Sequence, residues 1–190
     1  HKQGKALTVT GDGTQRRDMA YVEDVVLANI FAMEYKENFN GQHFDVGTGE
    51  NISLNQIKEM VKRHEGYRLE PYRCTENKLT GGYGHVILPG EEVPTSKEGW
   101  DAIFDADFDK AVEGAARICE GMSMSDKKFG VWISMCFQLG ENGTSKFKNA
   151  IAAAKEKNWD LCSRELLASR WHQQTPHRCE ELADIIREED

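Results

Sequence analysis

Three polar side chains in one short stretch have the types and the spacing needed to hydrolyse a bond. Glu65, Cys74 and Thr80 are separated by eight and then five residues, in a run that ends at His85. A carboxylic acid can donate a proton, a thiolate can supply negative charge or act as a nucleophile, and a hydroxyl can hold a water molecule. If a helix end and a Gly-rich hairpin bring them to one cleft, they can carry out acid-assisted hydrolysis of a glycosidic bond.

The elements that must position these side chains are a helix and a β-ribbon. Ser53 followed by Gln56 forms a capping box, which predicts the start of an amphipathic helix. Glu65 stands at the carboxy end of that helix, just before Gly66, which is typical of a helix stop. The next residues, 67–85, predict a small β-ribbon whose glycines allow the backbone to pass close to a ligand.

Helical periodicity resumes after the ribbon and continues to the end of the chain. The strongly apolar run KFGVWISMCFQLG predicts a helix buried in a second, helical lobe. The expected helices start at Thr95 or Ser96, cover 128–140 up to the stop signals Gly140 and Asn142–Gly143, then 145–159 and 159–174, and start again at Pro176.

Residues from about 56 to 186 resemble the phage lysozymes of the T-even type. The run from Glu65 to His85 carries this resemblance, together with MCFQLGENG at 135–143 and SRWHQQTPHR at 169–178. It implies an α+β, mainly helical fold with two lobes, a small β-ribbon lobe and a helical lobe. It also implies a glycoside hydrolase that cleaves the β-1,4 bond between N-acetylmuramic acid and N-acetylglucosamine in peptidoglycan.

The same resemblance implies roles for individual residues. Glu65 would be the general acid, and Thr80 would position the attacking water. Cys74 stands where most relatives have aspartate. It could be a base, an electrostatic stabiliser, a nucleophile or a tolerated substitute. Whether the reaction inverts or retains the configuration at the anomeric carbon therefore stays open. His85 would pair with Asp107 in a structural contact. The implied substrate-binding residues are Gly84, Gln138, Gly140, Gly143, Gln174 and Arg178.

Each candidate catalytic residue also has an ordinary structural explanation. Glu65 alone would be a surface glutamate, Thr80 a strand threonine favoured by β-propensity, and Cys74 a small buried thiol. A second function is therefore a glycan-binding or structural module on the same fold, with Cys74 marking lost chemistry. The presence of both Glu65 and Thr80 favours the enzyme.

The first part of the chain resembles a different family. The runs at 11–26 and 44–54 resemble the carboxy-terminal part of NAD-dependent sugar-nucleotide epimerases and dehydratases, and a helix is expected from Met19 or Tyr21 to Tyr35. Neither a GxGxxG motif nor a Tyr-x-x-x-Lys couple is present, so we expect no NAD cofactor and no hydride transfer. We interpret 1–55, which includes Arg17, as an α/β epimerase-like remnant. It is joined to a lysozyme domain at 56–190 through a shared helix at 53–65. Natural recombination or deliberate design could both have produced this fusion.

Composition and charge exclude some classes of binding partner. The net charge of −8 argues against a nucleic-acid partner, and no stretch of 18 apolar residues could span a membrane. Five cysteines without CxxC spacing predict free thiols and a reducing compartment, and the histidines show no metal-site spacing. We therefore expect no metal. The resemblance to phage lysozymes further implies a monomer that acts on bacterial peptidoglycan and stays in the host cytoplasm until its release to the cell wall.

Overall fold

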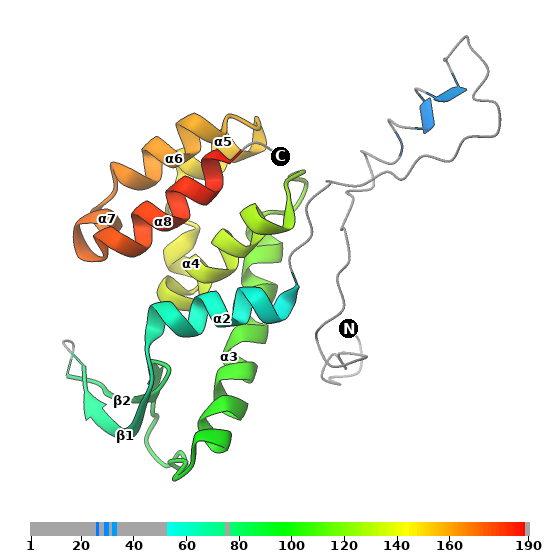
Figure 1. Cartoon of the computed structure of the whole chain (residues 1–190). Helices are drawn as coiled ribbons and strands as arrows, with labels where there is room; N and C mark the ends of the chain where they lie inside the picture. Colours follow the sequence, from blue (N-terminus) through cyan, green and yellow to red (C-terminus); the bar gives the residue numbers. More distant parts are fainter. Residues whose placement is uncertain (1–25, 27–28, 31, 34–52, 75–76, 189–190) are drawn as a thin grey trace.

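The structure is a computed structural model that describes residues 26, 29–30, 32–33, 53–74 and 77–188. Figure 1 shows a β-ribbon at the end of one short helix, a long helix beside it, and a group of helices beyond. The elements of this part, in chain order, are α2 (Leu54–Glu65), β1 (Arg68–Arg73), β2 (Leu79–Gly82), β3 (His85–Val86), α3 (Lys97–Ile118), α4 (Asp126–Thr144), α5 (Lys148–Lys155), α6 (Trp159–Leu167), α7 (Arg170–Gln174) and α8 (Pro176–Arg187).

Helix α2 has the ends that its sequence predicts. The Ser53 side chain accepts from the Gln56 backbone N–H, and the Gln56 side chain accepts from the Ser53 backbone, so the capping box is complete. At the other end Gly66 has φ +69°, a conformation that glycine adopts without cost. Ile57 and Val61 are buried on the face of α2 that meets α4.

The small lobe is a three-stranded antiparallel sheet in the order β1-β2-β3. Tyr72 of β1 pairs with Thr80 of β2, and Thr80 also pairs with Val86 of β3. An irregularity in register lies between Arg68 and Tyr72. The expected β-ribbon is therefore present, and its middle strand carries Thr80.

The long helix α3 joins the sheet to the helical lobe. Ser96 caps its first turn by accepting from the Gly99 N–H, as predicted. One turn later, the Trp100 indole N–H donates to the Leu69 carbonyl at 2.9 Å, which ties α3 to β1. Further along, α3 packs lengthwise on α4 (Figure 1). The mainly helical α+β fold that the sequence predicts is thereby confirmed.

The helical lobe is built around α4, whose Trp132, Ile133 and Met135 are fully buried. The predicted stop at Gly140 is a kink, with φ 70° and ψ 164°, and the helix resumes beyond it. The short helical stretch beyond it ends at Thr144, one residue after the predicted stop at Asn142–Gly143, and the Thr144 hydroxyl donates to the Gly140 carbonyl at 3.0 Å.

The predicted single helix over 159–174 is two helices. Helix α6 ends at Leu167, and Ser169 starts α7 by accepting from the His172 backbone N–H at 3.3 Å. A serine that bonds to the backbone in this way favours a cap over a helix interior, which explains the break. The last helix begins at Pro176, as predicted.

The amino-terminal predictions fall mostly outside the described residues. The five residues that are described there, all within the helix expected up to Tyr35, are helical: Val26, Asn29, Ile30, Ala32 and Met33. The 1–55 domain, its strands and Arg17 are not otherwise described. Among the residues that are described, no helix is long and apolar enough to cross a membrane.

Candidate active site

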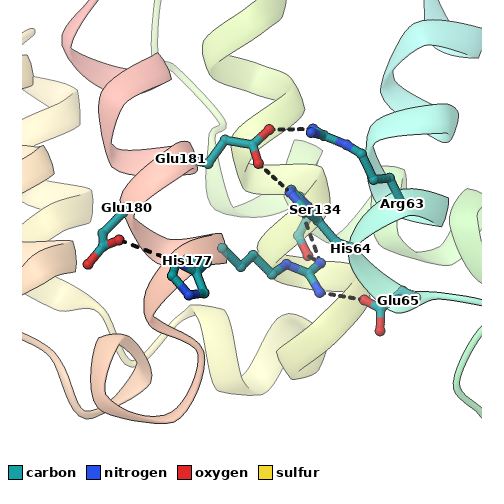
Figure 2. A network of polar contacts seen from close by, with 8 residues as sticks. Arg63, His64, Glu65, Ser134, His177, Glu180 and Glu181 are labelled. Atoms are coloured by element: carbon teal, nitrogen blue, oxygen red, sulfur yellow. Dashed lines mark hydrogen bonds and ion pairs between the residues drawn. The ribbon is translucent and has the colours of Figure 1, made fainter.

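Glu65 and Arg178 meet across the molecule, although 113 residues separate them. Arg178, near the start of α8, donates from Nη1 to Glu65 Oε1 at 2.6 Å, and both side chains are largely buried. Its Nη2 donates to the Ser134 carbonyl at 2.9 Å and to the Ser134 hydroxyl at 3.0 Å, so α4 fixes the guanidinium from behind (Figure 2). The charge-assisted contact orients the carboxyl group of Glu65.

The β2–β3 turn brings a third element to the same carboxyl group. Gly84 has φ +87°, and a Cβ at this position would lie 3.4 Å from Glu65 Oε2. A side chain at position 84 would therefore begin in contact with the second carboxyl oxygen. The positive φ favours glycine here. The structure thus brings together Glu65, Gly84 and Arg178, all of which the sequence assigns to the site.

A pocket of about 360 Å³ opens between the sheet lobe and the helical lobe. Gly84, His85 and Val86 line one wall, and Phe137 and Gly140 belong to the other. Since Gly84 also borders the Glu65 carboxylate, this pocket reaches the same region of the molecule as Glu65. A cleft between two lobes, lined by backbone and by a few polar groups, is typical of a ligand site.

Thr80 and Cys74 both bond to Lys78 in the β1–β2 hairpin. Thr80 belongs to β2 and pairs with Tyr72, and Cys74 directly follows the end of β1. The Cys74 backbone N–H donates to the Lys78 carbonyl at 3.0 Å, and the Thr80 hydroxyl donates to the same carbonyl at 3.1 Å. The hairpin therefore holds the two predicted residues in a fixed relation, while their joint action with Glu65 stays a prediction.

Among the five cysteines, which all lie in the described ranges, no disulfide is formed, as the sequence predicts. Cys74 is half-buried, whereas the other four thiols are buried. Burial raises the pKa of Cys119, Cys162 and Cys179 to about 12 and that of Cys136 to about 11. These four are neutral packing residues at ordinary pH.

The predicted contact between His85 and Asp107 is present, at 2.5 Å between Nδ1 and Oδ2. The sequence analysis missed a second partner, Glu91, whose Oε1 lies 2.9 Å from His85 Nε2. The Leu88 N–H and then His85 lower the pKa of Glu91. Flanked by two carboxylates, the imidazole ties β3 to α3, and its purely structural role stays a prediction.

The remaining predicted substrate-binding residues lie elsewhere. The Gln138 side chain accepts from the Trp171 indole N–H at 2.8 Å, which fixes α4 to α7. Gly143 is inside α4, where a Cβ would lie 3.0 Å from that of Leu139. Gln174 is exposed at the end of α7. Their contact with a substrate stays a prediction.

Several residues behind Glu65 were missed by the sequence analysis. His64 Nε2 lies 3.1 Å from Glu181 Oε2, and Arg63 donates to the other oxygen of the same carboxylate (Figure 2). Ser134 holds Arg178, as described above. The sequence indicated only that Arg178 and Glu181, three residues apart, lie on one face of a helix. This spacing does not indicate which residues of α2 they contact. Within the described residues, no group of three or more His, Cys, Asp or Glu side chains is arranged to hold a metal.

Two family models match the chain. The phage lysozyme model matches residues 62–187, and the model of the NAD dependent epimerase/dehydratase family matches residues 1–47. A putative UDP-glucose 4-epimerase of Methanocaldococcus jannaschii is 37% identical over 62 residues, which cover 33% of this chain and 19% of that protein.

Proteins similar to the larger part include two with lysozyme or phage names. Probable T4-type lysozyme 1 of Dictyostelium discoideum is 28% identical over 162 residues, which cover 70% of this chain and 94% of that protein. The pre-baseplate central spike protein Gp5 of Enterobacteria phage T4 is 24% identical over 168 residues, 75% of this chain and 29% of that protein. The lysozyme model alone matches 126 of the 190 residues, and the described fold has the two lobes expected for it. The chain belongs to the phage lysozyme family.

Proposed function

We propose that this protein is a peptidoglycan hydrolase that cleaves the β-1,4 bond between N-acetylmuramic acid and N-acetylglucosamine. The observation that carries the proposal is the placement of Glu65. Its carboxyl group is largely buried at the end of α2, bound to Arg178 on one side and bordered by Gly84 on the other. Family membership supports a glycoside hydrolase, and the geometry supports Glu65 as its acid.

In this mechanism Glu65 donates its proton to the oxygen that leaves with one sugar. A water molecule held by the Thr80 hydroxyl then attacks the anomeric carbon, and the Cys74 thiolate takes up the proton that this water loses. Alternatively, the thiolate stabilises the developing positive charge and the proton passes to bulk water. Arg178 keeps the Glu65 carboxyl group in the orientation that the transfer needs, because two of its nitrogens are fixed by α2 and α4 at once.

The substrate-binding part of the proposal concerns the pocket between the lobes. Gly84 and Gly140 line it from opposite sides. Its charged lining residues form ion pairs, Lys110 with Asp107 and Arg117 with Glu141, so the pocket offers balanced polar groups to a sugar chain. We also propose that the protein acts on the cell wall after release from the cytoplasm, in lysis of the host, and that it works as a monomer.

Replacing the proposed acid tests this function. Glu65→Gln keeps the size of the side chain and an acceptor for Arg178, but an amide cannot donate the proton. We expect the loss of turbidity of murein sacculi to slow by about 10²- to 10⁴-fold. Circular dichroism should show an unchanged fold.

Glu59→Gln is the matched control, because Glu59 is an exposed glutamate on the same helix. It should lyse sacculi like the unsubstituted protein. Rapid lysis by a folded Glu65→Gln variant would refute Glu65 as the acid. Binding of sacculi by the unsubstituted protein without any lysis would instead favour a non-catalytic glycan-binding module.

A further inference from the structure

The last turn of α2 is attached to α8 by consecutive side chains. Glu65 contacts Arg178, and His64 contacts Glu181, which lies three residues further along α8. Arg63 donates to Glu181 as well. Residues three apart lie on the same face of a helix, so Arg178 and Glu181 present one surface to the end of α2. Figure 2 shows these contacts side by side.

His64 is buried at this junction, with a side chain only 7% exposed. Burial lowers its pKa, and the charges of Arg178 and Arg63 act in the same direction, while the hydrogen bond to Glu181 raises it. Partial burial opposes ionisation of Glu181, but hydrogen bonds from His64 and Arg63 outweigh it and lower the pKa of that carboxyl. A neutral imidazole beside an ionised carboxylate is the state that these groups favour.

That state fixes the tautomer of His64. An ionised carboxylate only accepts hydrogen bonds, so Nε2 must carry the hydrogen and Nδ1 must be bare. Among the described residues, Nδ1 of His64 and Nε of Arg178 are buried and make no hydrogen bond. Protonating His64 would therefore add a buried N–H without an acceptor and a positive charge beside Arg178, at a cost in free energy.

We propose that His64 and Glu181 are positioning residues for Glu65: with His64 neutral they hold the end of α2 on α8, and protonation of His64 disturbs the Glu65–Arg178 contact and slows the reaction. This inference rests on the proposed hydrolase function. The charged groups that face His64 are Glu181 and Arg178 from α8 and Arg63 from α2. The imidazole thus makes the site sensitive to mildly acidic pH.

The direction of the pH effect follows from the lowered pKa. Between the folded-state pKa and the ordinary value of 6.5, the unfolded chain binds the proton more readily than the folded one. The stability that neutral His64 contributes is complete above 6.5 and decreases as the pH falls from there to the folded-state pKa. Activity should decline at lower pH, as the pH falls through the folded-state pKa, because only there does the folded protein take up the proton.

The test compares His64→Gln with the unsubstituted full-length chain. Glutamine places an amide N–H near the position of Nε2 and can donate to Glu181, but it does not titrate. We compare the lysis rate at pH 5 with that at pH 7 on purified murein sacculi. The ratio of the two rates should rise roughly threefold in His64→Gln, which is about half a unit in its decimal logarithm. Thermal unfolding between pH 5 and 7 should lose part of its pH dependence in the same variant.

A second pair of variants keeps the test decisive if His64→Gln does not fold. Glu181→Gln removes the carboxylate that binds both Arg63 and His64 and should lower the rate at pH 7. Glu180→Gln is the matched control, since Glu180 is the preceding residue on α8 and faces His172 and His177 instead. It should leave the rate and the pH profile unchanged.

Two results would overturn the proposal while the hydrolase function stands. One is an active, folded His64→Gln variant with the pH profile of the unsubstituted chain, and the other is equal activity of Glu181→Gln and Glu180→Gln. If the unsubstituted protein lyses no sacculi at any pH, the proposed function is refuted and this inference is refuted with it.

Discussion

Cys74 differs from the other cysteines in its surroundings as well as in its sequence context. It lies half-buried just after the end of β1, in the hairpin that leads to Thr80. The other four thiols are buried, and their raised pKa values keep them neutral. Cys136 lines the pocket between the lobes, but it is only 4% exposed. Cys74 is the least buried of the five thiols, and it is the one for which chemistry is worth testing.

Cys74→Ser separates a working thiolate from a spacer. A hydroxyl near neutral pH supplies neither an anion nor a good nucleophile, so we expect lysis of sacculi to fall by roughly tenfold or more. Cys74→Asp should preserve or raise the rate, because a carboxylate can take the same role. The rates should be measured between pH 5 and 9 on variants whose folding is verified by circular dichroism.

Full activity of Cys74→Ser at every pH would contradict a role for the thiol. Glu65 and a water held by Thr80 would then carry the hydrolysis. Alkylation is a weaker test, since an adduct on Cys74 could block the pocket by its size.

At the scale of residues, the sequence predicted the positions and contacts that a short motif indicates. Glu65 at a helix end, Gly84 in the hairpin turn and the His85–Asp107 contact all followed from short runs. The contact between His64 and Glu181 joins residues 117 positions apart, and it exists because the fold brings the last turn of α2 within side-chain reach of α8. No local pattern contains that information.

At the scale of elements, the contact between α3 and the sheet depends on two glycines. The indole of Trp100 lies against the backbone of Gly81 and Gly82, and a Cβ on Gly81 would lie 2.4 Å from Trp100 Cη2. Trp100 is 1% exposed and is held by its hydrogen bond to Leu69. The ring therefore has little freedom to move away.

We expect Gly81→Ala to destabilise the protein by about 1–3 kcal/mol, the cost of overpacking a tight contact. Urea unfolding followed by circular dichroism would measure it. Gly130→Ala is the control, because Gly130 is helical and its Cβ would lie 3.3 Å from the flexible Ile57 side chain. The alanine there gains up to about 1 kcal/mol of helix propensity. If both variants unfold at the same urea concentration, the Trp100 contact is more yielding than its geometry indicates.

The breaks between elements were harder to predict than the elements themselves. Capping by Ser53 and Ser96 gave correct helix starts, because a side-chain hydrogen bond to the backbone is a local event. At Gly140 the glycine signal produced a kink followed by one more helical turn, in which the buried Thr144 hydroxyl donates to the Gly140 carbonyl. Packing against other elements decides between the two outcomes.

At the scale of the whole molecule, the lysozyme-like part includes residues that precede the match to its family model. The family model begins at residue 62. Ile57 and Val61 precede that start, yet they are 3% and 0% exposed and contribute to the core shared with α4. The Ser53 cap lies further upstream. A folded lysozyme-like unit therefore needs α2 from its first turn.

Two deletions test this boundary. Removing residues 1–50 should leave a folded protein with unchanged lysis, because the Ser53 cap and every core residue of α2 remain. Removing residues 1–61 deletes Ile57 and Val61, and the loss of each buried aliphatic side chain costs about 2–5 kcal/mol. That protein should be unfolded or inactive at 37 °C by circular dichroism and turbidity. Normal lysis after the larger deletion would refute the requirement for α2.

The two family models leave a gap between residues 47 and 62, and most of α2 lies in it. An α-helix turns by about 100° per residue, so a residue added or removed between Ile57 and Val61 rotates everything before it around the axis relative to everything after. Sequences from two families can be joined here only at offsets that keep these two side chains on one side. The joint is thus constrained by angle as well as by length, and a single inserted residue would turn Ile57 away from Gly130 while leaving the chain long enough to connect.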